Sequence, residues 1–222
     1  MKRTLLQFVL IFFLIFFTTF NPANNSNLND FVFPLKYIKI ENNRVVEKDD
    51  LYKKLSFLIG KNLLSINSLD VEKVLKKYEF ISGVNIKKIY PHTLKLIINE
   101  KTPIAILTNK NKSFYISDAG DFLNFKKIDN FKNLPMVFGK GDNFISFYES
   151  LTKVNFPINT IKSYYYFELG RWDIILTDER LIKLPIANYE ESLINFIKIN
   201  SNKELKNYKL FDYRISSQLI LK

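Results

Sequence analysis

Apolar and polar positions divide the chain into one continuous apolar run and a long region of alternating patterns. The apolar run covers residues 4–20, contains no charged residue, and follows Lys2 and Arg3. It is apolar on every side, which is typical of a helix that crosses a membrane. At about 1.5 Å per residue a helix of this length extends roughly 25 Å, the short end of what spans a bilayer. We therefore predict a transmembrane signal anchor over residues 4–20.

The charges before this run predict its orientation. Lys2 and Arg3 favour a cytoplasmic tail of residues 1–3, with the rest of the chain across the membrane in a bacterial periplasm. A cleaved signal peptide has the same basic start and apolar run, but residues 17–22 lack the small residues that a cleavage site requires. The uncleaved anchor is favoured, followed by a polar linker over residues 21–32.

Residues 33–101 have the pattern of a compact unit of strands and helices. Period-two alternation predicts the strands, and apolar residues three or four positions apart predict the helices, in the order β-α-α-β-β. The approximate bounds of these elements are 35–40, 47–59, 67–78, 83–89 and 94–100.

Residues 102–222 are richer in strand patterns. Strands are expected near 112–117, 122–123, 134–139, 170–178, 181–185, 210–214 and 215–222. Apolar residues at helical spacing predict two helices, over 142–154 and 189–199. The fold class is therefore α+β: a transmembrane helix, a β-α-α-β-β unit, and a mainly antiparallel β-domain with flanking helices.

Composition excludes several kinds of chemistry. The chain has no cysteine and a single histidine, His92, so it can form neither a disulfide nor a Cys/His zinc site. The formal charge of +11 raises nucleic acid as a partner, but the excess lysines are scattered and follow no nucleic-acid-binding motif. We expect no nucleic-acid binding.

No pattern indicates catalysis. Asp118 and Asp121 could serve as an acid/base pair, but their spacing around Ala119 and Gly120 is also that of a tight turn. The six glycines are isolated from one another, so no phosphate-binding loop is present in the sequence. We expect no enzyme activity, no cofactor, no metal and no small-molecule substrate.

Several short motifs together resemble one protein family. The runs 60–64, 90–94 and 100–105 are similar to the POTRA domain of the FtsQ/DivIB cell-division proteins. The run 170–185, with Trp-Asp, a hairpin and a closing Leu-Pro, resembles a segment of alphaproteobacterial FtsQ, and residues 210–214 resemble the family's Asp-Leu-Arg ending. The hairpin lacks the usual glycine, Tyr213 replaces the usual leucine, and the cytoplasmic tail is unusually short.

The resemblance implies a function as well as a fold. It implies a POTRA domain over 33–101, an FtsQ-type β-domain over 102–222, and a non-catalytic scaffold essential for septum assembly by the bacterial divisome. The implied location is the inner membrane at the division septum, with a single span and a periplasmic bulk. The implied partners are FtsB and FtsL, with a segment of FtsB received by the terminal region of the β-domain.

A physical argument also favours this terminal region. A last strand at the edge of a sheet leaves unpaired backbone donors and acceptors, which accept an added strand. The candidate partner-binding residues are Arg171, Tyr213, Arg214, Ile215, Ser216, Ser217, Gln218, Leu219, Ile220 and Leu221. The alternative is that these are ordinary edge-strand residues. Trp172, the only tryptophan, is expected in the core.

Two other function classes remain open at this point. One is a POTRA-bearing factor for envelope transport or outer-membrane assembly, although such proteins carry several POTRA units or a large β-barrel. The other is a cell-wall enzyme held by a signal anchor, which would need Asp118 and Asp121 in a concave pocket.

Overall fold

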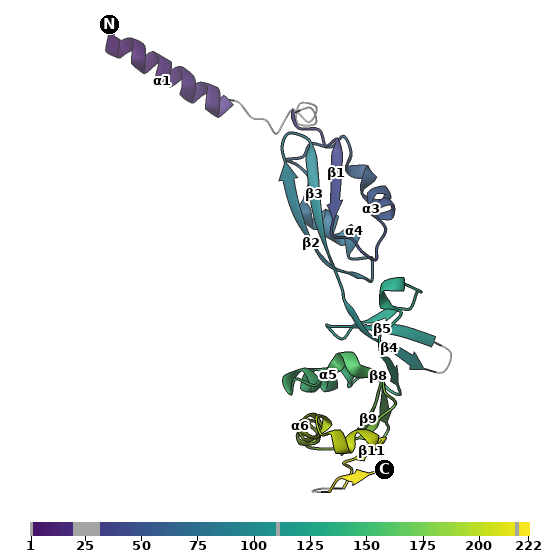
Figure 1. The fold of residues 1–222 in the computed structure, drawn as a ribbon. Coiled ribbons are helices and arrows are strands. Elements are labelled where there is room, and N and C mark those ends of the chain that lie inside the picture. The colour runs from purple at the N-terminus through teal and green to yellow at the C-terminus, as the bar shows by residue number, and fades with distance from the viewer. Residues whose placement is uncertain (1, 20–31, 110–111, 216–217) are drawn as a thin grey trace. The chain divides into compact units, whose positions relative to one another are not determined.

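The computed structural model describes residues 2–19, 32–109, 112–215 and 218–222, and it divides into two compact units (Figure 1). The first unit contains Met1–Glu100 and the second contains Lys101–Lys222. The expected α+β class is confirmed by both units, because each consists of a sheet with helices packed on it.

The chain begins with helix α1 (Lys2–Thr19), which lies on the apolar run. Within the described residues, no helix has both the length and the apolarity needed to cross a membrane. The transmembrane helix predicted over 4–20 is therefore not confirmed by the structure, and residue 20 and most of the expected linker lie outside the described residues.

The first unit has a three-stranded sheet in the order β1-β3-β2. Its strands are β1 (Tyr37–Glu41), β2 (Ile81–Ile89) and β3 (Thr93–Glu100). Its helices are α3 (Lys48–Leu55), the 3-10 turn η2 (Ser56–Leu58) and α4 (Ser68–Leu75). The predicted order β-α-α-β-β is confirmed. β1 is parallel to β3, whereas β2 is antiparallel to it.

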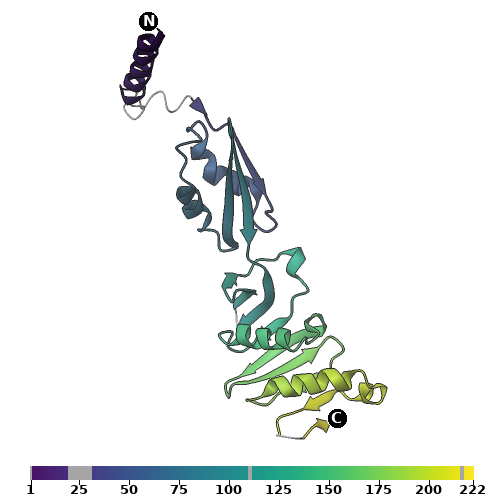
Figure 2. The same cartoon turned by 90° about the vertical axis from the view of Figure 1, so that its left-hand side faces the viewer.

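Both helices cover one face of this sheet (Figures 1 and 2). The side chains between helices and sheet are fully buried, among them Leu51 on α3, Val71 on α4, and Leu94 and Leu96 on β3. α4 begins where predicted because the Asn67 side chain accepts a hydrogen bond from the Leu69 N–H at 3.0 Å. Among the described residues of this unit, no helix packs on the opposite face of the sheet (Figures 1 and 2).

The second unit contains, within the described residues, a nine-stranded sheet in the order β12-β11-β10-β9-β8-β7-β4-β5-β6. Its strands are β4 (Pro103–Asn109), β5 (Lys112–Ser117), β6 (Phe122–Asn124), β7 (Met136–Phe138), β8 (Ile161–Phe167), β9 (Arg171–Leu176), β10 (Leu181–Lys183), β11 (Leu210–Asp212) and β12 (Ile220–Leu221). Its helices are α5 (Phe144–Lys153), α6 (Tyr189–Asn200) and the 3-10 turns η3 (Asp129–Phe131), η4 (Ile158–Thr160) and η5 (Lys203–Asn207).

The two helices expected in this unit explain why its sheet is mixed. α5 connects β7 to β8 and α6 connects β10 to β11, and both connected pairs are parallel. β4 and β7 are also parallel, while the other neighbouring pairs are antiparallel. A crossover helix returns the chain to the same end of the sheet, so the next strand runs parallel.

α5 and α6 lie on the same face of the sheet and cover the main core of the unit (Figure 1). Trp172 is 4% exposed and stacks on Phe147 of α5, with ring centroids 4.7 Å apart and planes 7° from parallel. On α6, Phe196 contacts Phe211 of β11 edge to face, at 5.0 Å. The prediction that Trp172 belongs to the core is confirmed.

The predicted final strand over 215–222 is largely wrong. β12 contains only Ile220 and Leu221 and pairs antiparallel with β11, whereas the described residues 213–215 and 218–219 belong to no strand. The physical reason is that Tyr213 continues toward β10 and the core, since its N–H donates to the Lys183 carbonyl at 2.9 Å. The chain must then reverse before it can pair with β11. Ser216 and Ser217 lie outside the described residues.

Candidate partner-binding site

The C-terminal strand β12 is one edge of the second unit's sheet (Figure 2). It pairs antiparallel with β11, with Leu221 opposite Phe211. The neighbouring pair of residues, Leu210 and Lys222, is hydrogen-bonded. The N–H of Leu210 donates to the Lys222 carbonyl at 2.9 Å, and the N–H of Lys222 donates to the Leu210 carbonyl at 3.2 Å.

This register determines where the backbone of Leu221 points. In an antiparallel ladder, hydrogen-bonded pairs alternate with pairs whose N–H and C=O groups point outward. Leu210 and Lys222 form a hydrogen-bonded pair, so Phe211 and Leu221 form the outward-pointing kind. The N–H and C=O of Leu221 therefore face the open edge, where an additional strand can bind them.

Tyr213 does not lie on this edge. It is 7% exposed, packs with the core residues, and its hydroxyl lies 3.1 Å from the amide oxygen of Asn195 on α6, to which it donates. Burial raises the pKa of this hydroxyl. Its aromatic ring stabilises the unit, and it offers little surface to a partner.

Arg214 is the exposed member of a tight ion pair beside the edge. Its Nε and Nη2 donate to the two carboxylate oxygens of Asp212 at 2.8 and 2.6 Å. The Asp212 side chain is 6% exposed and the Arg214 side chain is 44% exposed. A bidentate pair of this kind fixes the guanidinium in one orientation. Arg214 therefore presents a positioned positive charge next to β12.

Beside this ion pair, a row of three charged residues crosses three neighbouring strands of the sheet. Asp173 of β9, Lys183 of β10 and Asp212 of β11 are neighbours in register. They lie on the face without helices, because the residues that alternate with them, such as Trp172 and Phe211, belong to the core under α5 and α6. These three residues were not identified as site residues from the sequence, although the Asp-Lys-Asp alternation of sign becomes visible once the strand register is known.

The two carboxylates of this row respond differently to their surroundings. Hydrogen bonds from the Arg214 side chain lower the pKa of Asp212. Burial raises the pKa of Asp173, and the nearby charges of Arg171, Lys183 and Arg214 only partly offset that effect. Asp212 is thus held as a carboxylate, whereas the charged form of Asp173 is disfavoured by its location.

Arg171, predicted as an additional contact, lies three strands away from β12. Its Nε donates to Asp173 at 3.1 Å, and its guanidinium lies 4.3 Å from the centre of the Phe167 ring. Its side chain is 18% exposed. The structure brings Arg171 and Arg214 to the same sheet face, because both interact with Asp173, but Arg171 does not reach the open edge.

A hollow of about 610 Å³ lies behind the β11–β12 connection. Its lining includes Arg214, Ile215, Gln218 and Leu219 from the connection. The other wall comes from α6 and the segment before it, with Pro185, Ala187, Asn188, Glu191, Ser192 and Asn195. Because Ile215 is 52% exposed and Ile220 is 38% exposed, the edge and the hollow together form a partly apolar surface with polar walls.

Asp118 and Asp121 form no acid/base pair of the kind that a cell-wall enzyme needs. The turn prediction is confirmed, since Gly120 has φ +84° and its N–H donates to the Ser117 carbonyl at 2.9 Å. Asp121 instead forms an ion pair with Lys101 at 3.1 Å.

Comparisons with known proteins identify the family. The model of the POTRA domain, FtsQ-type, matches residues 33–101, and that of the cell division protein FtsQ/DivIB C-terminal region matches residues 105–214. The cell division protein FtsQ of Rickettsia bellii (strain RML369-C) is 30% identical over 186 residues, which cover 82% of this chain and 69% of that protein. The chain belongs to the FtsQ family of cell division proteins.

A second curated relative agrees with the expected alphaproteobacterial resemblance. FtsQ of Bartonella bacilliformis is 23% identical over 191 residues, covering 84% of this chain and 62% of that protein. A solved extracytoplasmic domain of DivIB from Geobacillus stearothermophilus is 16% identical, covers 49% of this chain and 98% of that domain, and has a TM-score of 0.34. FtsQ-family proteins are non-catalytic components of the division machinery, which confirms the expectation that this chain is not an enzyme.

Proposed function

We propose that this FtsQ-family chain is a membrane-anchored scaffold that recruits the FtsB–FtsL pair to the division septum by strand addition at β12. The observation that carries the proposal is the outward-pointing backbone of Leu221 on an edge strand. An incoming strand can pair with it without displacing any strand of the sheet.

Charge and shape next to this edge support the same proposal. Arg214 is oriented by Asp212 and half exposed, so an acidic side chain of the partner can pair with it. The hollow behind the connection offers Ile215 and Leu219 to an apolar side chain. Backbone pairing would supply affinity, and these two features would supply selectivity and register.

Anchoring in the inner membrane belongs to the proposal as well. It is supported by the uncharged run 4–20, by the positive residues Lys2 and Arg3 before it, and by family membership. An anchor of this kind would place both units in the periplasm and confine the search for FtsB and FtsL to the plane of the membrane.

One backbone substitution tests the mechanism. Leu221→Pro removes the outward N–H but none of the hydrogen bonds between β11 and β12, since proline is tolerated on an edge strand that donates outward. Leu221→Ala is the matched control because it keeps the N–H and shortens the side chain. Purified full-length chain in detergent is titrated with the periplasmic segment of FtsB from the same organism.

We expect Leu221→Pro to weaken binding by about tenfold, the loss of one strand hydrogen bond together with the steric block, and Leu221→Ala to weaken it less. Circular dichroism checks that both variants are folded. Equal binding by the wild type and the proline variant would place the contact elsewhere. Absence of binding by the wild type would overturn the recruitment proposal itself.

A further inference from the structure

One end of the first unit gathers exposed apolar side chains from three segments far apart in the sequence. At this end β1 and β3 begin and β2 finishes, since Thr93 pairs with both Tyr37 and Ile89. We call the segments 32–37, 56–66 and 88–93 the entry end, because the chain enters the unit there. Six of its apolar side chains are between 39% and 56% exposed: Val32, Phe57, Ile59, Leu64, Ile89 and Tyr90. A contiguous apolar surface on a folded domain marks a contact with a protein or a membrane.

Hydrogen bonds and a ring contact join the three segments of the entry end. The N–H of Leu63 donates to the Phe33 carbonyl at 2.8 Å, and the N–H of Lys36 donates to the His92 carbonyl at 2.9 Å. The Phe33 and Tyr90 rings meet edge to face, with centroids 5.3 Å apart. The entry end is therefore one connected surface.

The entry end is also basic. It contains Lys36, Lys61 and Lys88, and its three segments contain no aspartate or glutamate. These lysines form no ion pair among the described residues. The ammonium group of Lys88 donates to the Leu64 carbonyl at 3.0 Å. That of Lys61 lies 5.0 Å from the centre of the exposed Phe57 ring. Uncompensated positive charge and exposed apolar side chains thus lie side by side.

Positive charge continues along the sheet face without helices. Lys39 of β1, Lys95 of β3 and Lys87 of β2 are direct neighbours in register, two residues in from the entry end. Of these three, Lys95 forms an ion pair with Glu41, at 2.7 Å. Like charges opposite one another destabilise a sheet, so an anionic neighbour would relieve the row.

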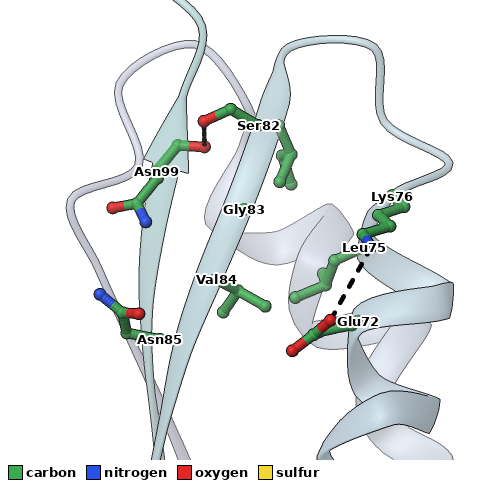
Figure 3. Close-up of a pocket in the computed structure, with 9 residues that line it drawn as sticks. Glu72, Leu75, Lys76, Ser82, Gly83, Val84, Asn85 and Asn99 are labelled. Carbon is green, nitrogen blue, oxygen red and sulfur yellow. Dashed lines mark hydrogen bonds and ion pairs between the residues drawn. The ribbon is translucent and has the colours of Figure 1, made fainter.

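The opposite end of the unit has a different character. Figure 3 shows that Lys76 has an acidic partner there, Glu72, with the two charged groups 3.9 Å apart. The Ser82 hydroxyl donates to the Asn99 carbonyl at 2.8 Å beside them. The two ends of one unit therefore provide a test surface and its control.

We propose that the entry end rests on the anionic surface of the membrane that holds residues 4–20. Lys36, Lys61 and Lys88 would lie next to lipid phosphates, and the exposed apolar side chains would enter the headgroup region. The inference rests on the membrane anchor of the proposed function. Aromatic and apolar side chains beside lysines are typical of surfaces that bind this region of a bilayer. The stem of a lysine can cover apolar surface while its ammonium group reaches a phosphate.

Chain length supports the membrane as the occupant. Residues 21–31 extend about 40 Å at most, so the entry end stays near the bilayer in which the preceding run is anchored. Charge argues against a second copy of this chain, because two facing entry ends would bring together lysines without acidic partners. An anionic lipid surface attracts basic residues next to it and needs no matching register.

Fluorescence quenching in vesicles tests the proposal. The chain has no cysteine, so Leu64→Cys introduces the only thiol within the entry end, and Ser82→Cys introduces it at the opposite end. Each full-length variant is labelled with a small fluorophore and reconstituted in vesicles of phosphatidylethanolamine and phosphatidylglycerol that contain a nitroxide-headgroup lipid. Vesicles of phosphatidylcholine with the same nitroxide lipid are the uncharged comparison. Flotation of the vesicles shows separately whether the chain is anchored.

Charge reversal supplies a second readout in the same vesicles. Lys61→Glu changes the sign of one charge within the entry end. Lys77→Glu is the matched control, because it makes the same change at an exposed lysine between α4 and β2, at the opposite end.

We expect the label at residue 64 to be quenched about threefold more strongly than the label at residue 82 in the anionic vesicles. This difference should shrink in phosphatidylcholine and at high salt, since the attraction of lysines to anionic lipid is screened. Lys61→Glu should reduce quenching at residue 64 about twofold, and Lys77→Glu should change it much less.

Equal quenching at the two ends, quenching that ignores anionic lipid, or equal effects of the two charge reversals would overturn the proposal. A chain that floats with the vesicles but is not quenched at residue 64 would overturn this inference and leave the anchor standing. A chain that does not float would overturn both. Disulfide formation between unlabelled Leu64→Cys chains in place of quenching would assign the surface to a second copy.

Discussion

Glu100, the last residue of β3, holds the loop that follows β1. Its Oε1 and Oε2 accept hydrogen bonds from the backbone N–H groups of Arg44, Val45 and Val46, at distances of 2.9 to 3.1 Å. These are residues more than fifty positions away in the sequence. One carboxylate therefore satisfies three consecutive backbone donors, so Glu100→Ala is expected to destabilise the first unit.

The magnitude follows from these contacts. A hydrogen bond to a charged acceptor contributes about 1.5–3 kcal/mol when it is shielded from water. Arg44 is exposed, so water can replace the carboxylate there, whereas Val46 is 7% exposed and Val45 is partly buried. Discounting for this partial exposure, Glu100→Ala should cost about 2–4 kcal/mol. Glu41→Ala, which removes one exposed ion pair with Lys95, should cost about 0–1 kcal/mol.

Hydrogen exchange of the full chain can measure this difference unit by unit. When exchange follows local unfolding, about 1.4 kcal/mol corresponds to a tenfold change in rate. Amides of β1 and β3 should exchange at least tenfold faster in Glu100→Ala than in wild type, with the second unit unchanged. Rates within twofold of those of Glu41→Ala would refute the idea that Glu100 organises the loop.

Three further outcomes are expected. Tyr164→Phe should leave stability unchanged or raise it by about 1 kcal/mol in chemical denaturation, because the hydroxyl is buried without a hydrogen-bond partner among the described residues; a loss above that size would contradict this. Asp212→Asn should cost more stability than Asp173→Asn at pH 7, because the pKa of Asp212 is lowered in the folded chain whereas that of Asp173 is raised. The cost of Asp212→Asn should disappear on acidification. A lowered carboxyl pKa stabilises the fold above the pKa of the unfolded chain, near 4, and this stabilisation is lost as the pH falls through the pKa of the folded chain. A cost independent of pH would argue against the Arg214 ion pair as its source. Finally, the full chain should remain in the membrane pellet after alkaline extraction if residues 4–20 anchor it, and release into the supernatant would contradict the anchor.

Periodicity in the sequence was sufficient for most local elements. The helices of both units follow apolar spacing, α4 also follows its capping residue Asn67, and the β-α-α-β-β order of the first unit is read from these patterns. The predicted second helix extends to Tyr78, but α4 ends at Leu75, because the chain must turn to enter β2. Such ends depend on tertiary packing, which a pattern of polarity does not contain.

Strand pairing was beyond the reach of these patterns. The row Asp173, Lys183 and Asp212 and the row Lys39, Lys95 and Lys87 exist only through registers between strands far apart in the sequence. A strand pattern specifies which residues share a face, but not which residues of another strand lie opposite. This is why Arg171 and Arg214 could be proposed singly, while the charged row that relates them could not.

The conformation of the turn between β9 and β10 is a second feature that the sequence pattern did not specify. The hairpin between β9 and β10 contains no glycine, and Glu179 takes the left-handed conformation there with φ +68°. This conformation costs a residue with a side chain about 1–2 kcal/mol. Glu179 also forms an ion pair with Lys162 at 2.6 Å.

The central claim is strand addition at β12, and disulfide trapping tests it most directly. The chain contains no cysteine, so Leu221→Cys introduces the only thiol. Cysteines are placed one at a time along the periplasmic segment of FtsB, and disulfide formation with the full chain is measured under mild oxidation. Strand addition predicts strong crosslinking at the position opposite residue 221, weaker crosslinking two residues away, and none at the directly adjacent positions, because successive side chains of a strand point to opposite faces. Crosslinking with a helical period of three to four residues, or at no position, would contradict strand addition.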